Sequence, residues 1–294
     1  MVVMQDIFTP ALIFPNSLKK RLRRKTKHGL ISMNCPIPLG SPLLVMLSLS
    51  PVAESATLLR RVGVVVGSVL VTLGYCLDVL WRAAFRRLDR ARVDRYTRGW
   101  ASKLLRLVRL QVTVFGKAPD FSDGRRYMVL CTHASHYDIP VSFVVLPGSI
   151  RMLAKAELYR IPVLGVTMRL AEFPSINRHN RERALADLSR ARQMMESGIV
   201  LWAAPEGTRS RTAELLPFKK GCFHLALDTD AIIVPVAIRG IHNVLPARSW
   251  RFNLGQQVSV HIGEPLDAGS YDREQLPELM AETRKRIAGL LGQG

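Results

Sequence analysis

A histidine and an aspartate five positions apart, His133 and Asp138, lie in a polar segment that follows the apolar run 127–131. On one continuous helix, residues at this spacing would diverge by about 140°, so the imidazole and the carboxylate can meet only where the chain turns. A strand followed by a turn and a helix supplies such a place. A carboxylate that holds one ring nitrogen keeps the other available for a proton, as a general base for a hydroxyl requires. The alternative is that Asp138, two residues before Pro140, caps the helix.

A second polar segment follows the apolar run 199–202 and contains Glu206, Gly207, Thr208 and Arg209. Gly207 allows the backbone to approach a ligand closely. The planar guanidinium of Arg209 suits a phosphate or a carboxylate. A surface turn with a local ion pair between Glu206 and Arg209 is the alternative. Both polar segments follow predicted strands, and the ends of strands are where α/β sheets carry their active sites.

The composition narrows the class of protein and of partner. The chain of 294 residues is 48% hydrophobic and 22% charged, which excludes a disordered protein and predicts a sizeable core. Forty-two Lys and Arg oppose 23 Asp and Glu, so the formal net charge is +19. Such a charge favours an anionic partner, either nucleic acid, anionic lipid or a phosphorylated substrate. The four cysteines are far apart, which suggests neither a disulfide framework nor a metal site and fits a reducing, cytosol-facing environment.

The first part of the chain divides into two segments. Residues 1–57 carry a basic cluster and a Pro-rich apolar stretch, and we predict a poorly ordered extension there. A cleaved secretory signal is the alternative, although prolines interrupt its apolar run. Residues 58–109 begin with the apolar run 62–81, whose twenty positions would reach about 30 Å as a helix, the thickness of a bilayer core. This helix can span a membrane or insert less deeply, and a buried core helix is the alternative.

The stretch 82–109 is strongly basic and has large apolar residues at helical spacing, as an interfacial amphipathic helix would. Such a helix would lie on anionic headgroups. A basic nucleic-acid-binding helix is the alternative, but the apolar segment beside it argues against nucleic acid. We therefore predict that 58–109 is a membrane-associating helical segment on the cytosolic face of the cytoplasmic membrane.

Residues 110–294 alternate between strand-like and helix-like patterns. The pattern predicts helices over 180–197 and 275–291 and a mixed, mostly parallel sheet of about seven strands, flanked by helices, in an α/β domain. The predicted strands cover 111–115, 127–131, 150–154, 171–176, 199–203, 231–238 and 257–262. The active site is expected beyond the strand ends.

Five blocks in this domain resemble, in order and spacing, those of the glycerolipid acyltransferase family, typified by 1-acylglycerol-3-phosphate acyltransferases. The blocks are His133, Ser135 and Asp138; the Lys and Pro-Gly segment 154–165; Arg178 within 173–178; Pro-Glu-Gly-Thr-Arg-Ser at 205–210; and the Val-Pro block 233–238. The resemblance covers roughly residues 100–265. It implies direct transfer of a fatty acyl group from a coenzyme A or acyl carrier protein thioester to a glycerolipid hydroxyl, without an acyl-enzyme.

The resemblance also implies roles for individual residues. His133 would be the base and Asp138 its orienting partner. The substrate-binding residues would be Arg178 and Arg209 on the acceptor phosphate, Glu206, Gly207 and Thr208 around the acceptor, and Lys155 as an added positive charge. No metal and no cofactor beyond the thioester donor are expected. The expected partners are anionic membrane lipid and a lysophospholipid acceptor, with 1-acylglycerol-3-phosphate giving phosphatidic acid.

The chain departs from the family pattern near the acceptor blocks. Thr132 stands where Asn is frequent, Ala204 where Phe precedes Pro-Glu-Gly, and the segment Glu172 to Ser175 lacks the Gly and the Phe of the second block at their usual positions. Another lysolipid, such as a lyso-ornithine lipid, is therefore an alternative acceptor. A non-catalytic basic membrane-binding protein is the alternative from a different class, and it would have no use for His133 or Asp138.

Overall fold

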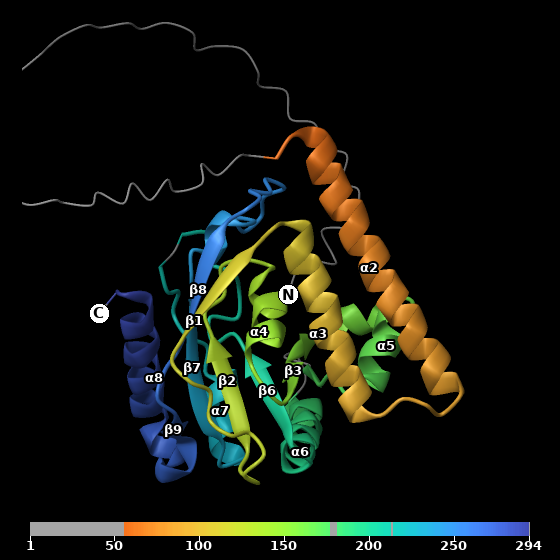
Figure 1. Cartoon of the computed structure of the whole chain (residues 1–294). Helices are drawn as coiled ribbons and strands as arrows, with labels where there is room; N and C mark the ends of the chain where they lie inside the picture. Colours follow the sequence, from red (N-terminus) through yellow and green to blue (C-terminus); the bar gives the residue numbers. More distant parts are fainter. Residues whose placement is uncertain (1–55, 177–180, 213, 294) are drawn as a thin grey trace, which may run out of the picture.

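The computed structural model describes residues 56–176, 181–212 and 214–293 (Figure 1). The extension predicted over 1–57 lies outside the described residues except for its last two positions. The remainder forms a helical hairpin followed by an α/β domain. The helices flank the sheet on both of its faces, as expected for this class of fold.

The seven-stranded sheet has the order β1-β8-β7-β2-β6-β3, with the short β9 paired to β7. Its strands are β1 (Gln111–Phe115), β2 (Tyr127–Cys131), β3 (Ser149–Met152), β6 (Ile199–Ala203), β7 (Ile232–Arg239), β8 (Gln257–Ile262) and β9 (Leu266–Asp267). β2 runs parallel to both of its neighbours, β6 and β7, and β3 runs parallel to β6. β8 is antiparallel to β7 and parallel to β1, so the sheet is mixed but mostly parallel, as predicted.

Alternate residues of each central strand serve the two faces of the sheet. Tyr127 and Val129 of β2 belong to the core under α3 (Arg90–Leu107) and α4 (Asp138–Val145). Met128 and Leu130 of the same strand point to the opposite core. That second core is covered by α6 (Arg181–Glu196), α7 (Gly221–Asp228) and α8 (Leu276–Leu291). A strand buried on both faces reads as a continuous apolar run, which is why β2 and β6 were recognisable from sequence.

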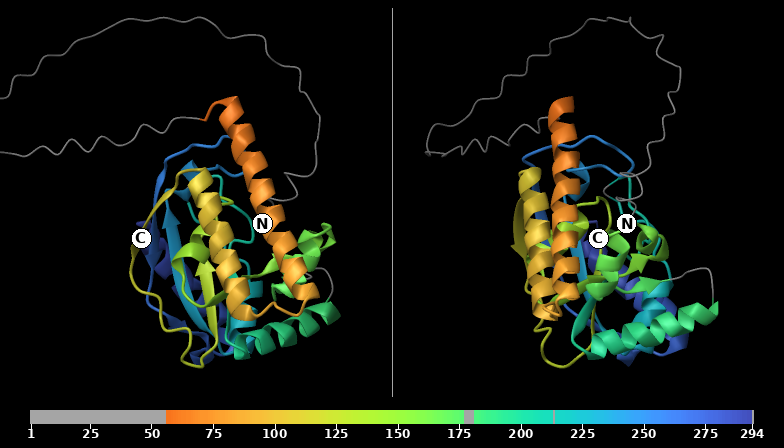
Figure 2. Two further views of the ribbon diagram at one scale, coloured as in Figure 1. Left: turned by 45° about the vertical axis from the view of Figure 1, so that its right-hand side comes forward. Right: turned by 90° about the vertical axis from the view of Figure 1, so that its right-hand side faces the viewer.

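The hairpin consists of α2 (Leu58–Ala84) and α3, which lie alongside each other on one face of the sheet (Figure 2). The contact between them is close at Gly99, where a Cβ atom would come 2.6 Å from the Tyr75 hydroxyl oxygen. Trp100 Nε1 donates a hydrogen bond of 3.0 Å to Thr72 Oγ1 across the same contact. The opposite side of α2 is an exposed apolar stripe made of Leu58, Leu59, Val62, Val66, Leu70, Leu73, Leu77 and Trp81.

Within the described part of the chain, α2 is the one helix that is long and apolar enough to cross a membrane, and only 17% of its most apolar stretch is buried. A soluble core helix would be mostly buried. The structure confirms the long apolar helix predicted from the run 62–81. The helix begins four residues earlier and ends three residues later than that run.

The strand expected over 171–176 is wrong for most of its length. Helix α5 (Leu164–Leu170) occupies the preceding residues, and Glu172 adopts a left-handed backbone conformation with φ 59°. Only β5 (Ser175–Ile176) is extended, and it pairs with β4 (Ala154–Lys155) in a separate two-stranded sheet. The strand expected over 150–154 is divided between β3 and β4. The short 3-10 helix η1 (Ala156–Arg160) follows β4 directly.

Candidate active site

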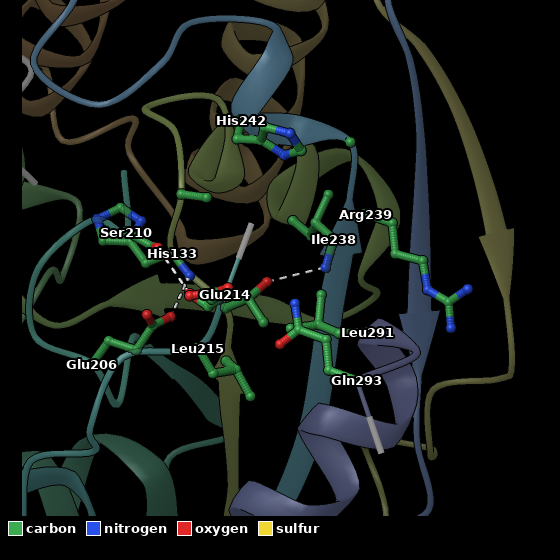
Figure 3. A pocket seen from close by; sticks show the side chains of 13 residues that line it. His133, Glu206, Ser210, Glu214, Leu215, Ile238, Arg239, His242, Leu291 and Gln293 are labelled. Atoms are coloured by element: carbon green, nitrogen blue, oxygen red, sulfur yellow. Dashed lines mark hydrogen bonds between the residues drawn. The ribbon is translucent and has the colours of Figure 1, made fainter. Parts of the chain in front are cut away.

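Two loops meet at the carboxyl ends of β2 and β6, which are parallel neighbours in the sheet. The backbone of His133 joins them, since its N–H donates to Glu206 Oε1 at 3.0 Å and its carbonyl accepts from the Ser210 N–H at 2.7 Å. Figure 3 shows Glu206 and Ser210, both from the second loop, close to His133. The two polar segments singled out in the sequence therefore form one site.

His133 and Asp138 form a buried pair. Asp138 is the first residue of α4, and its Oδ2 atom lies 2.9 Å from His133 Nδ1. The same oxygen accepts the N–H groups of Ala134 and Ser135, each at 2.9 Å. The carboxylate thus holds the loop 132–137 that precedes α4, and the residue before α4 forms no side-chain capping hydrogen bond. The exposed fractions are 4% for His133 and 0% for Asp138, so solvent does not screen the pair.

Burial lowers the pKa of His133, and this effect outweighs the opposing effect of Asp138. The imidazole is therefore neutral at neutral pH, the state that a base requires. With Nδ1 engaged by Asp138, Nε2 is the ring nitrogen that would accept a proton. The edge of Trp202, from β6, packs against the His133 ring with centroids 6.2 Å apart. This contact and the Asp138 hydrogen bond fix the ring orientation.

The Glu206 side chain is buried and stabilises the two loops through hydrogen bonds to their backbone. Its second oxygen accepts the Leu216 N–H at 3.0 Å, so each carboxylate oxygen binds one backbone N–H. Burial raises its pKa to about 7, the backbone hydrogen bonds opposing that rise. Glu206 and His133 line a small cavity of about 110 Å³ together with Glu214, His242 and residues from the end of α8 (Figure 3).

A much larger cavity, about 1180 Å³, lies between the hairpin and the α/β domain. Its walls are mostly apolar and come from α2, α3, α4, α5 and the segment 245–252. The cavity reaches the site at His136, Thr208 and Arg209. Ligand pockets are typically about 300–1000 Å³, so this one has room for a long apolar chain.

The structure brings together most of the residues predicted for substrate binding. Gly207 has φ 68°, a conformation that favours glycine. Thr208 is exposed at the large cavity, whereas Arg209 is buried there and lies within hydrogen-bonding distance of His136. Lys155 lies on β4 and lines neither of the two cavities described above. Arg178 lies outside the described residues, so its role stays a prediction.

Several contacts of the site were not predicted from the sequence. Thr132 Oγ1 accepts the Ile238 N–H at 3.1 Å, which extends the pairing of β2 with β7 up to the catalytic loop. Ser135 is fully buried, and its hydroxyl donates to the Leu245 carbonyl at 2.9 Å. That hydrogen bond links the loop after β2 to the segment that contains Leu245. These partners are more than 100 positions apart in the chain, so no local pattern marks them.

Comparisons with known proteins agree with this arrangement. A sequence model of the family described as Acyltransferase matches residues 111–239. The 1-acyl-sn-glycerol-3-phosphate acyltransferase of Haemophilus influenzae is 32% identical over 171 residues, which is 56% of this chain and 70% of the relative. The enzyme of that name from Cocos nucifera is 32% identical over 166 residues, 56% of this chain and 53% of the relative.

A solved structure is similar as well. The crystal structure of the 1-acyl-sn-glycerophosphate (LPA) acyltransferase PlsC from Thermotoga maritima superposes with a TM-score of 0.63 at 25% identity. The superposition covers 79% of this chain and 95% of the Thermotoga chain, so the likeness extends beyond the segment 111–239 that the family model matches. The relative from Haemophilus influenzae, 32% identical and covered over 70% of its length, shows the family to which this chain belongs. The chain is a member of the acyltransferase family.

Proposed function

We propose that this acyltransferase moves a fatty acyl group from a coenzyme A or acyl carrier protein thioester to the free hydroxyl of a lysophospholipid, with 1-acylglycerol-3-phosphate as the acceptor and phosphatidic acid as the product. The observation that carries the proposal is the buried His133–Asp138 pair, in a loop whose His136 lines a large apolar cavity. The printed names of the relatives support this choice of acceptor.

The chemistry follows from the state of His133. Its neutral imidazole removes the proton from the acceptor hydroxyl while the hydroxyl oxygen attacks the thioester carbonyl carbon. Asp138 stabilises the imidazolium that forms. Collapse of the tetrahedral intermediate breaks the carbon–sulfur bond, and the proton passes from His133 to the leaving thiolate. The products are an ester and a free thiol, and no acyl-enzyme is needed. A positioned base contributes about 100- to 10,000-fold to such a rate.

Recognition of the acceptor is assigned to two arginines, of which Arg209 lines the large cavity. In this proposal Arg209 and Arg178 bind the acceptor phosphate, because a guanidinium fork matches the geometry of phosphate oxygens. Arg209 is buried at the point where the large cavity reaches the catalytic loop, which supports its part of the proposal. The apolar walls of the cavity would take the fatty chains.

We also propose that the hairpin, residues 58–109, attaches the catalytic domain, residues 110–294, to the cytosolic face of the cytoplasmic membrane. The exposed apolar stripe of α2 is the feature that supports attachment. A lipid substrate dissolved in the bilayer could then enter the large cavity, since α2 and α3 form one wall of it. Anionic headgroups would complement the many arginines of α3.

The decisive test is an acyl-transfer assay of the full-length protein with both donor types and a panel of lysolipid acceptors. Transfer to 1-acylglycerol-3-phosphate should exceed transfer to lyso-ornithine lipid and to acceptors without a phosphate. Arg209→Ala should raise the KM for the phosphorylated acceptor far more than the KM for the acyl donor, because losing a charge-assisted contact costs about 1.5–3 kcal/mol. Preference for a non-phosphorylated acceptor would contradict the assigned substrate.

A further inference from the structure

His136 makes a contact that the proposed chemistry does not use. It lies in the turn between β2 and α4, three positions after His133, and its Nε2 atom is 2.5 Å from Arg209 Nη1. A guanidinium carries only donors, so Nε2 must accept this hydrogen bond. The ring is then neutral, and its proton resides on Nδ1. The two residues are 73 positions apart in the chain.

The surroundings keep the ring of His136 in that neutral state. Burial strongly lowers its pKa, and the nearby positive charge of Arg209 lowers it further. His133 acts in the same direction. His136 therefore offers a hydrogen-bond acceptor that does not titrate across the working range of pH, which is the property needed to hold a permanently charged guanidinium.

His136 Nδ1 is buried and has no hydrogen-bond partner among the described residues. Buried donors without a partner are rare in folded proteins, and each one calls for an explanation, such as a functional contact made by the same side chain. Here the ring leaves Nδ1–H unpaired while Nε2 meets Arg209. His136 also lines the large cavity, so this contact lies at the proposed substrate site.

The loops on either side fix this contact relative to the base. The Arg209 loop is tied to the His133 backbone through Glu206 and Ser210, and His136 belongs to the same turn as His133. The guanidinium is thus held at a set position from the imidazole that takes the proton. An acceptor that places its phosphate on Arg209 would have its hydroxyl presented to His133 by the same framework.

We infer that His136 is a positioning residue: it orients the Arg209 guanidinium towards the anionic headgroup of the acceptor, and so contributes to selection of phosphorylated lysolipids. The inference rests on the proposed function, because it takes Arg209 to bind the acceptor phosphate. It adds a residue to which neither the sequence motifs nor the chemistry of the base assign a role.

The test compares three substitutions in the full-length enzyme. His136→Gln places an amide oxygen near the position of Nε2 and should keep the acceptor for Arg209. His136→Asn is the matched control, because its shorter amide reaches only the position of Nδ1. His136→Leu removes the acceptor altogether. KM is measured for 1-acylglycerol-3-phosphate, for a monoacylglycerol without phosphate and for the acyl donor.

We expect His136→Leu and His136→Asn to raise the KM for the phosphorylated acceptor about 10- to 100-fold, with smaller changes for the other two substrates. His136→Gln should recover most of the loss. Adding His136→Leu to Arg209→Ala should have little further effect, because both act through one group. The acid limb of the pH profile should stay in place in His136→Gln, since the titrating base is His133.

The outcomes separate this inference from the function on which it rests. If Arg209→Ala impairs the phosphorylated acceptor selectively but His136→Leu does not, the positioning role is overturned and the proposed function stands. If Arg209→Ala itself shows no selectivity, the phosphate role of Arg209 fails and the inference fails with it. Equal losses in the Gln and Asn variants would also overturn the inference, because a bulk packing effect would then explain them.

Discussion

At the scale of single residues, the site depends on one carboxylate oxygen. Asp138 Oδ2 accepts His133 Nδ1 and two backbone N–H groups, so it orders the catalytic loop and the imidazole together. Asp138→Asn preserves the shape but removes the charge that stabilises the imidazolium. The pair is thus expected to act as one catalytic unit.

We predict that His133→Ala removes nearly all turnover and that Asp138→Asn lowers kcat by about 100- to 10,000-fold. The double variant should be little slower than His133→Ala, because residues that act as a unit are not additive. Single-turnover acyl transfer measures the effect, and near-ultraviolet circular dichroism checks that each variant is folded. Multiplicative losses in the double variant would show that the two residues act independently.

The acid limb of the pH profile is a second prediction at this scale. Because burial lowers the pKa of His133, the base stays neutral to a lower pH than an exposed histidine, whose pKa is about 6.5. The kcat/KM of the free enzyme should therefore fall only below that pH, as His133 becomes protonated and loses its function. A profile of kcat/KM against pH with the phosphorylated acceptor tests this. An acid limb clearly above pH 6.5 that persists in Glu206→Gln would contradict the assignment, because Glu206 itself has a pKa of about 7.

At the scale of elements, a buried ion pair between Arg151 and Asp94 holds the hairpin against the sheet. Arg151 on the edge strand β3 has no exposed surface, and its Nη1 atom donates to Asp94 of α3 at 2.7 Å. Ser149 donates to the other oxygen of Asp94 at 2.6 Å, and Arg151 Nε binds the Ala171 carbonyl. One guanidinium thus connects α3, β3 and the end of α5, which all border the large cavity or lie next to it.

Asp94→Ala should destabilise the protein by about 3–5 kcal/mol, because it leaves the buried guanidinium of Arg151 with only the more distant carboxylate of Glu172, 3.8 Å from its Nη2 atom. The matched control is Asp89→Ala, which removes the side chain that caps α3 by accepting the Arg92 N–H at 2.7 Å. That loss should cost only about 0.5–2 kcal/mol. The double substitution Asp94→Leu with Arg151→Met should recover most of the stability. Denaturant unfolding in detergent measures all three, and equal effects of the two single changes would contradict the role of the buried pair.

At the scale of the whole molecule, membrane attachment can draw on both charge and apolar surface. The formal net charge is +19, α3 contains several arginines, and α2 carries the exposed apolar stripe. Electrostatic attraction is screened by salt over about 10 Å at 0.1 M, whereas burial of an apolar helix face in lipid is not. The two contributions to membrane attachment can therefore be separated.

We predict that binding to anionic vesicles weakens as salt rises but that a large fraction stays bound in molar salt. Leu70→Glu with Leu77→Glu on α2 should abolish this salt-resistant fraction, because both side chains are exposed on the stripe. Val114→Glu, an exposed position on β1, is the matched control and should have no such effect. Vesicle co-sedimentation measures the bound fraction. Complete release of the unsubstituted protein in molar salt would show that attachment is electrostatic alone.

Local pattern determined much of this protein. The strands β1, β2, β6 and β8 have the bounds expected from their sequence patterns. β2 and β6 are continuous buried apolar runs, and β1 and β8 alternate between apolar and polar residues. The meeting of His133 with Asp138 was also foreseeable, since the partners are five positions apart and the turn between them is local. The parallel sheet placed the second polar loop at the same edge, as alternation of strands and helices predicts.

Long-range contacts decided the rest. Glu172 holds its left-handed conformation beside a two-bonded ion pair with Arg90, 82 positions away, and that contact rather than strand propensity shapes the segment 171–174. The pairing of β1 with β8 and the contact of His136 with Arg209 likewise join distant parts of the chain. The large cavity exists only because the hairpin packs against the domain. Propensity and periodicity describe neighbours along the chain, whereas these features depend on which distant surfaces bury one another, and only the tertiary structure determines that.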